Sequence, residues 1–185
     1  VINESAETIV ATGAVISSIP MVDSIPSVSM FEDGDDVIVD ADAGTVEIKG
    51  MEMRTVVSSV ILSGGRILML KRPETCRSFP GKWSLVSGKI ESGEFPVEAA
   101  RREIVEETQI CVANPDAMLK PIYVRENGIL WKVHPFLYRL GEVEPVLNEE
   151  NEAFDWVDPA DVGKRSVVDD VPRIVEGLVR RANSE

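Results

Sequence analysis

The chain has 185 residues, enough for one good-sized domain or for one domain with an appendage. Its hydrophobic content of 44% and charged content of 28% are ordinary for a soluble globular protein. The formal net charge of −13 argues against nucleic acid or an anionic membrane surface as partners. Small phosphorylated substrates are still compatible with this charge, because they need only a local cluster of basic residues.

Two further features bear on where the chain works. Its cysteines, Cys76 and Cys111, are far apart and match no metal-binding or redox spacing, so a reducing compartment is expected. No apolar run approaches the roughly 20 residues of a membrane-spanning helix, and we recognise no signal peptide. The sequence therefore predicts a cytoplasmic protein without a membrane partner.

The first 50 residues differ from the rest in charge. They hold ten acidic residues and one basic residue, Lys49, for a net charge of −9, whereas the remainder carries −4. We expect residues 1–50 to form a small β-rich N-terminal segment. Residues 37–39 and 45–48 flank a turn signal, which indicates a hairpin, and residues 8–16 form an apolar run with small residues.

Two stretches of this segment resemble a known family. Residues 13–20, Gly-Ala-Val-Ile-Ser-Ser-Ile-Pro, and residues 34–48, Gly-Asp-Asp-Val-Ile-Val-Asp-Ala-Asp-Ala-Gly-Thr-Val-Glu-Ile, are similar to the C-terminal part of the swivelling β-domain of the aconitase X family. The resemblance covers a fragment and transfers no active site. It suggests a truncated module that packs on the following domain or mediates assembly.

Residues 51–185 are predicted to form a second domain that starts with strands. Residues 55–62 and 66–70 are rich in β-branched residues and are joined by Ser63-Gly-Gly, which indicates a hairpin. Between positions 66 and 89 six bases stand against one acid, so we expect phosphate contacts from this stretch. The candidate substrate-binding residues are Lys71, Arg72, Arg77, Lys82 and Lys89.

A helix is predicted to begin at Pro96, because proline suits a first helical position. Within it, Glu103, Glu106 and Glu107 are three or four positions apart or adjacent, so their carboxylates form a stripe on one face. Oxygen donors after a glycine turn suit a hard divalent cation such as Mg²⁺ or Mn²⁺. Taken alone, a Glu-rich stripe is more often a solvated helix face.

The spacing of this stretch favours the metal site. It fits the pattern G-x5-E-x7-R-E-U-x-E-E-x-G-U, where U is a bulky aliphatic residue, at Gly88, Glu94, Arg102, Glu103, Ile104, Glu106, Glu107 and Ile110. This resembles the Nudix box, the signature of the Nudix hydrolase superfamily. The resemblance implies an α/β fold for residues 51–185, namely an α/β/α sandwich with a mixed sheet.

One position departs from the pattern, since Gln109 stands where the box has glycine. A glycine there would end the helix in a left-handed conformation, which costs another residue about 1 kcal/mol. We therefore expect an altered helix exit and a working site.

The segments after the box are predicted to complete the sheet. Residues 121–125 and 129–140 indicate two strands around a tight turn, and residues 169–181 indicate a packing helix. Residues 148–162 are similar to the segment that closes the Nudix sheet, where many relatives place one more acid near the metal. The candidates for that acid are Glu149, Glu150 and Glu152.

The resemblance implies a metal-dependent pyrophosphohydrolase. Its substrate would be a nucleoside diphosphate linked to a moiety X: a nucleoside triphosphate, ADP-ribose, a nucleotide sugar or a dinucleoside polyphosphate. Arg102 should orient Glu103 through a charge-assisted hydrogen bond, and Glu103 is a third ligand or the general base. Glu94 should support the loop or a ligand. The implied metal ligands are Ser87, through its carbonyl, Glu103, Glu106 and Glu107.

Two other functions are compatible with this fold. A non-catalytic nucleotide sensor usually loses box carboxylates, and this chain keeps all of them. An enzyme resembling the type I isopentenyl diphosphate isomerases needs a pocket cysteine on a strand where this chain has Ser84-Leu-Val-Ser. The expected partner is a small-molecule nucleotide. The sequence leaves the oligomeric state open, with a homodimer as one possibility because members of the resembled family are frequently dimers.

Overall fold

The computed structural model describes residues 1–184, whose contacts group into two compact units. The first unit comprises Val1–Arg54 together with Ile122–Lys132. The second comprises Thr55–Pro121 and the chain from Val133 onward. The division into domains 1–50 and 51–185 stays a prediction.

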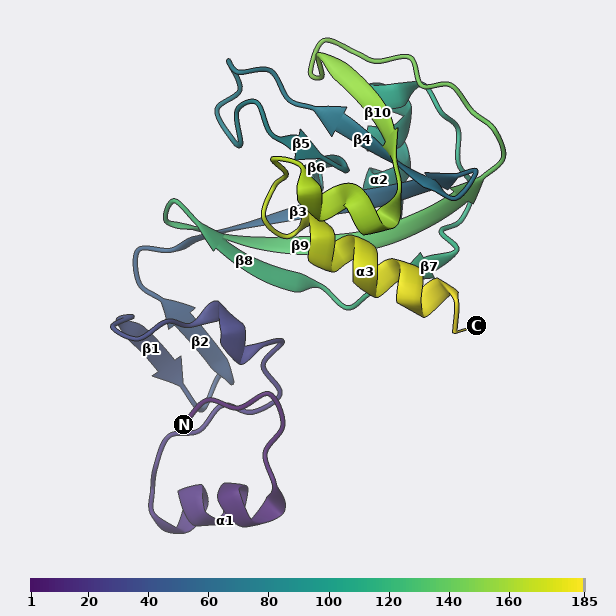
Figure 1. Ribbon diagram of the computed structural model, residues 1–185. Coiled ribbons are helices and arrows are strands. Elements are labelled where there is room, and N and C mark those ends of the chain that lie inside the picture. Colours follow the sequence, from purple (N-terminus) through teal and green to yellow (C-terminus); the bar gives the residue numbers. More distant parts are fainter. Residues whose placement is uncertain (185) are drawn as a thin grey trace. The chain divides into compact units, whose positions relative to one another are not determined.

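The first unit contains a helix, a short 3₁₀ turn and a hairpin (Figure 1). The hairpin strands pair antiparallel from Val37↔Ile48 to Asp40↔Thr45, and the Asp40 carboxylate accepts hydrogen bonds from two backbone N–H groups of the turn. This hairpin was predicted. These elements are α1 (Thr8–Ile16), η1 (Val28–Met30), β1 (Val37–Asp40) and β2 (Thr45–Ile48).

The helix α1 differs from the β-rich segment that was expected. Its apolar run is nine residues long, and at this length hydrophobic periodicity does not distinguish a strand from a helix. Small residues such as Ala11 and Ala14 favour the helix, and the Thr12 hydroxyl donates to the Thr8 carbonyl at 2.8 Å.

Within this unit, an ion pair joins the N-terminal segment to strand β8 (Ile122–Glu126). The Arg125 guanidinium donates to both carboxylate oxygens of Asp35, at 2.7 and 3.0 Å, and to the Met30 carbonyl at 3.4 Å. The Arg125 hydrogen bonds hold the pKa of Asp35 below its usual value. Planar, two-point contacts of this kind fix orientation as well as position.

The main sheet has eight strands in the order β10-β4-β3-β9-β7, with β5 beside β4, β6 beside β3 and β8 beside β9. Antiparallel pairing of β6 with β3 sets Ser87 opposite Ser58 and Gly88 opposite Val57. The strands are β3 (Glu52–Ser63), β4 (Arg66–Lys71), β5 (Trp83–Ser84), β6 (Val86–Lys89), β7 (Ala117–Met118), β8 (Ile122–Glu126), β9 (Ile129–Leu140) and β10 (Ala153–Val157).

Helices cover this sheet in the second unit. Figure 1 shows α3 (Val171–Ala182) in front of the sheet and α2 (Pro96–Thr108) behind it. Ala99, Ala100 and Ile104 of α2 pack into a buried cluster with residues of β3, β4, β6 and β9. A 3₁₀ turn, η2 (Pro159–Lys164), precedes α3. This is the predicted α/β/α arrangement.

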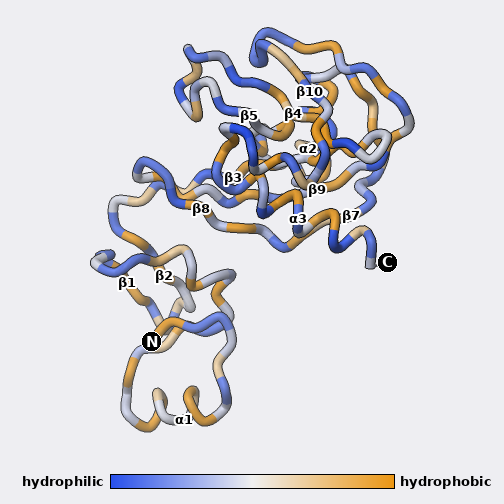
Figure 2. The backbone as a smooth tube through the Cα atoms, in the orientation of Figure 1, coloured by the Kyte–Doolittle hydropathy of each residue, from blue (hydrophilic) through white to orange (hydrophobic). Residues whose placement is uncertain are grey.

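Hydrophobic residues concentrate on the strands of the sheet, as Figure 2 shows. Burial of this surface is the main stabilising contribution to such a core. Within residues 1–184, none of the helices combines the length and the apolar character needed to cross a bilayer.

The exit of α2 corrects one expectation. Gln109 adopts the left-handed conformation, with φ 57° and ψ 14°, and its N–H donates to the Val105 carbonyl at 2.9 Å. The helix therefore ends as it would with glycine, and the altered exit was wrong. Since a side chain in this conformation is strained, the chain accepts a cost of about 1 kcal/mol here.

Replacement of Gln109 by glycine is expected to stabilise the protein. Gln109→Gly removes the strained side chain and should increase the unfolding free energy by about 1 kcal/mol, or roughly 2–4 °C in Tm. Thermal unfolding followed by circular dichroism measures this, with Gln109→Ala as the control that keeps the strain. A lower Tm for the glycine variant would mean that the Gln109 side chain contributes more than its conformation costs.

Candidate active site

The box residues lie where β6 leads through a turn into α2. Pro96 occupies the first turn of the helix, and the Glu98 carboxylate accepts a hydrogen bond from the Phe95 N–H at 3.0 Å. This interaction satisfies a donor that the helix itself leaves unpaired. The start of α2 is thus fixed, and with it the positions of the glutamates one to three turns later.

The Arg102 side chain connects most of the predicted residues. It donates to both oxygens of Glu94 at 3.0 and 3.1 Å, to Glu103 at 2.7 Å and to Glu106 at 3.1 Å. It also donates to the Lys89 carbonyl at 2.9 Å. The Arg102 hydrogen bonds lower the pKa of Glu94. Arg102 thus makes the expected charge-assisted hydrogen bond to Glu103, and the catalytic roles of Arg102 and Glu94 stay predictions.

Gly88 leaves the space that the Glu103 carboxylate occupies. A Cβ atom at position 88 would lie 1.8 Å from Cδ of Glu103, far inside any real contact. Burial raises the pKa of Glu103, although its hydrogen bond with Arg102 acts in the opposite direction. The glycine of the box is required here for space, since its φ is not positive.

Glu107 is the most buried of the box carboxylates, with 5% of its surface exposed. It accepts hydrogen bonds from the Ser87 N–H at 3.1 Å and from Nδ2 of Asn151 at 2.8 Å. Burial raises the pKa of Glu107 to about 7, because the loss of water disfavours its charged form more than these two hydrogen bonds favour it.

Asn151 is a residue of this site that the sequence did not reveal. It is 7% exposed and reaches Glu107 from the loop before β10. Of the three acids proposed in this loop, Glu150 is close enough for its charge to raise the pKa of both Glu103 and Glu107. The only signal in the sequence was a polar residue among acids just before a strand, and an amide carries no charge that would distinguish it from its neighbours.

The five basic residues predicted to bind phosphate differ in the contacts that they make. Lys71 pairs with Glu152 at 2.6 Å, so it lies next to the loop that carries Asn151. Lys82 pairs with Asp169 at 2.8 Å instead. Arg72 donates to the Ser78 carbonyl at 3.0 Å. The other two bases, Arg77 and Lys89, are exposed.

The donor set fits a hard divalent cation in its chemistry. It consists of carboxylate oxygens on one helix, with Glu107 buried and without a basic side chain among its hydrogen-bond partners. In the described part of the chain, no three His, Cys, Asp or Glu side chains are already arranged to hold a metal ion. Glu106 is exposed and pairs with Arg102 at 3.1 Å.

Loss of the Asn151 amide should destabilise the protein. Asn151→Ala leaves the buried Glu107 carboxylate with one hydrogen bond, which should cost about 1–3 kcal/mol of unfolding free energy. Chemical denaturation measures the loss, with Glu149→Ala, at an exposed position of the same loop, as the control. Equal effects of the two substitutions would show that the amide does not hold Glu107.

Comparison with family models identifies both parts of the chain. Residues 52–177 match the NUDIX domain, which confirms the resemblance drawn from the box. Residues 1–48 match the aconitase X swivel domain, as the N-terminal stretches indicated.

Two curated relatives differ in how much of their length is matched. Nucleoside triphosphatase NudI of Escherichia coli O139:H28 is 32% identical over 124 residues, which are 60% of this chain and 86% of that protein. The octanoyltransferase of Myxococcus xanthus is 35% identical over 120 residues, or 57% of this chain. The chain spans only 31% of that second protein.

A solved structure supports the same assignment. The MutT NUDIX hydrolase from Burkholderia pseudomallei superimposes with a TM-score of 0.60 at 28% sequence identity, covering 68% of this chain and 97% of that one. The chain therefore belongs to the NUDIX domain family, and this domain is a hydrolase domain that acts on phosphoric anhydride bonds.

Proposed function

We propose that the chain is a divalent-metal-dependent pyrophosphohydrolase of small nucleotides, with nucleoside triphosphates as the first substrate class. The observation that carries this proposal is the set of box carboxylates organised by Arg102 and by the Glu107–Asn151 hydrogen bond. The name of the NudI relative, a nucleoside triphosphatase, supports the choice of substrate. The other candidate substrate classes are ADP-ribose, nucleotide sugars and dinucleoside polyphosphates.

The carboxylates of Glu106 and Glu107, with the Ser87 carbonyl, would hold Mg²⁺ or Mn²⁺. When bound, such an ion supplies Lewis acidity toward the phosphate oxygens and toward water. Ser87 and Asn151 fix the Glu107 carboxylate in one orientation through hydrogen bonds to its two oxygens. Positioning of this kind is a large part of phosphoryl-transfer catalysis.

Hydrolysis also requires a proton acceptor. Attack of water on a phosphorus atom breaks the bond to the bridging oxygen, and the water gives up a proton in the process. Glu103 can accept it, because burial raises the pKa of its carboxyl and Arg102 holds its Oε1 at 2.7 Å. Glu103 is therefore the proposed general base. The sequence alone had allowed either this role or that of a metal ligand.

The substrate phosphates would meet the bases around β4 and β6. Lys71, next to the Asn151 loop, and the exposed Lys89 are the first candidates. Lys71 would exchange the carboxylate of Glu152 for a phosphate oxygen, which a point charge on a flexible stem can do. Arg72, Arg77 and Lys82 complete the proposed set. The cytoplasmic location and the homodimer stay predictions.

The Glu107→Gln substitution tests the reaction and the site together. It removes a ligand charge, so turnover should fall about 10²–10³-fold with the fold retained. Loss of substrate and formation of the nucleotide products are measured by ion-exchange chromatography on a panel of the four nucleotide classes with Mg²⁺ or Mn²⁺, and Glu142→Gln on an exposed loop is the control. Unchanged turnover in Glu107→Gln would contradict the assignment. A folded wild type that binds nucleotide and hydrolyses none of the panel would favour the sensor.

The space at Gly88 gives an independent test. Gly88→Ala should displace the Glu103 carboxylate, and a misplacement of about 1 Å can cost about 10²-fold in turnover. Gly141→Ala is the matched control, because nothing lies within 4 Å of a Cβ at that position. Both variants are assayed for turnover and for Tm. Full activity of Gly88→Ala would mean that the position of Glu103 does not matter to the reaction.

A further inference from the structure

Helix α1 of the N-terminal unit is apolar on all sides, yet its side chains are mostly exposed. It contains no charged residue, and Ala14 is its one buried residue. Ile9, Val15 and Ile16 leave 77%, 79% and 79% of their surfaces exposed. A helix that is hydrophobic all round is normally buried, and one of nine residues has little stability of its own in water. Its surface therefore needs a cover.

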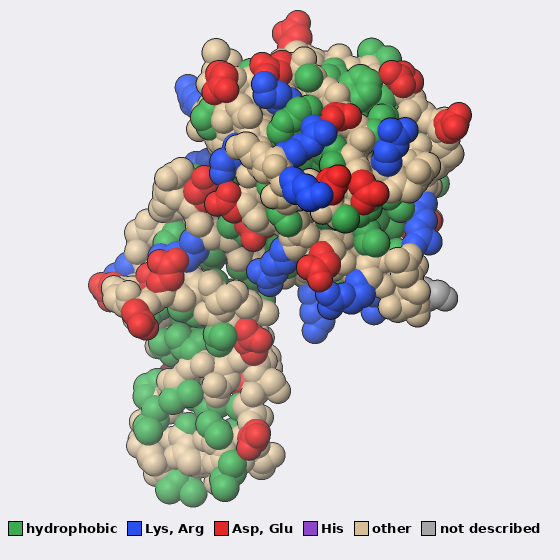
Figure 3. All heavy atoms as spheres, viewed as in Figure 1, with side chains coloured by type: hydrophobic (Ala, Val, Ile, Leu, Met, Phe, Trp, Pro, Cys, Tyr) green, Lys and Arg blue, Asp and Glu red, His purple; other side chains and the backbone are tan. Residues whose placement is uncertain are grey.

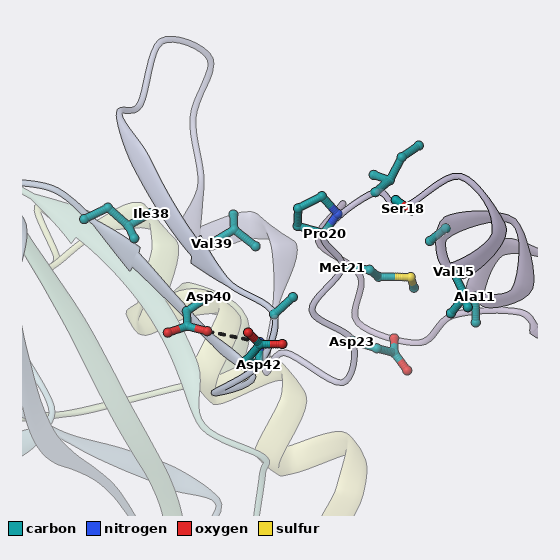
Figure 4. A pocket seen from close by; sticks show the side chains of 13 residues that line it. Ala11, Val15, Ser18, Pro20, Met21, Asp23, Ile38, Val39, Asp40 and Asp42 are labelled. Carbon is teal, nitrogen blue, oxygen red and sulfur yellow. Dashed lines mark hydrogen bonds between the residues drawn. The ribbon is translucent and has the colours of Figure 1, made fainter.

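A groove of about 820 Å³ runs beside this helix. Ala11 and Val15 of α1 line one side, Ile38 and Val39 of β1 line the other, and Met21 lies in the segment that connects them (Figure 4). Figure 3 shows hydrophobic side chains on the surface over α1. The groove thus continues into a wider apolar surface.

The charge around the groove is negative. Asp23, Asp40 and Asp42 contribute to its lining, residues 1–48 contain no Lys or Arg, and Lys49 is paired with Asp36 at 2.8 Å. Acidic rims attract Lys and Arg and repel nucleic acid and anionic lipid. A second copy would bring the same acidic segment against this one.

The extent of the apolar surface excludes a small molecule as its cover. Ile9 and Ile16 lie on α1 but do not line the groove, so a compound that fills the groove would leave them exposed. A polypeptide is large enough to fill the groove and to cover α1 as well. Recognition of an apolar segment in a groove is a recurrent mode of protein association.

We propose that the N-terminal unit is a docking surface for another protein, which places an apolar segment flanked by Lys or Arg into the groove beside α1. Apolar contact with α1 and β1 supplies affinity, and the acidic rim selects basic flanks and speeds association. The inference goes beyond the proposed hydrolysis and does not depend on it.

Peptide binding to the full chain tests the proposal. The probes are two fluorescent peptides of equal length. Both carry leucines at the same positions, spaced to lie on one face of a helix. All other positions are lysine in one peptide and glutamate in the other. Fluorescence anisotropy should show binding of the lysine peptide, weakened by salt, and at least about tenfold weaker binding of the glutamate peptide. Val15→Asp should weaken binding about tenfold or more, while Val146→Asp, an exposed valine in the other unit, should not.

A second variant separates charge from apolar contact. Asp23→Lys combined with Asp42→Lys keeps the apolar lining and should reverse the preference between the two peptides. Equal binding of both peptides by the wild type, or binding of neither, would overturn the proposal. A dimer in analytical ultracentrifugation that Val15→Asp dissociates would also overturn it, because the second copy would then be the occupant. A circular dichroism spectrum and a Tm of Val15→Asp equal to those of the wild type show that the variant is folded.

Discussion

The rest of the site depends on the Arg102 guanidinium. Its N–H groups reach both oxygens of Glu94, one oxygen each of Glu103 and Glu106, and the Lys89 carbonyl. One side chain thereby ties the loop before α2, the end of β6 and successive turns of α2 together. A lysine could not replace it, because an ammonium lacks the planar set of five donors that these acceptors use. The spacing of the box is thus the spacing that one guanidinium can span.

The environments of Glu94 and Glu107 shift the pKa values of their carboxyl groups in opposite directions. Arg102 hydrogen bonds lower the pKa of Glu94, whereas burial raises the pKa of Glu107 to about 7. Glu106 is exposed, and Glu150 adds a further negative charge nearby. One guanidinium does not neutralise this set. The excess negative charge is what a divalent cation would compensate, and Glu107, which has only neutral donors, stands to gain most from it.

The local parts of this arrangement could be predicted from the sequence, and the long-range parts could not. The helix start at Pro96 and the Arg102–Glu103 contact follow from spacing along one helix. Asn151 lies 44 residues from its partner Glu107, and an amide has no charge that would single it out. Gln109 shows the converse, because propensity favoured an altered helix exit, whereas Gln109 adopts the left-handed conformation and its N–H donates to the Val105 carbonyl.

Two parts of the N-terminal unit, the region near η1 and helix α1, are held in different ways. Near η1, the Arg125–Asp35 pair fixes the chain with little of either side chain exposed. Helix α1 has no charged residue that could form such an ion pair, and it keeps its backbone hydrogen bonds while its apolar side chains face water. Exposed apolar surface of this kind is costly to maintain, since it gains nothing for the folded unit and invites nonspecific association. The acidic residues around it counteract that association by repelling other acidic surfaces, including copies of itself. An apolar surface within an acidic segment therefore limits its contacts to partners that bring positive charge, and the anchored end allows the unit to bind one without refolding.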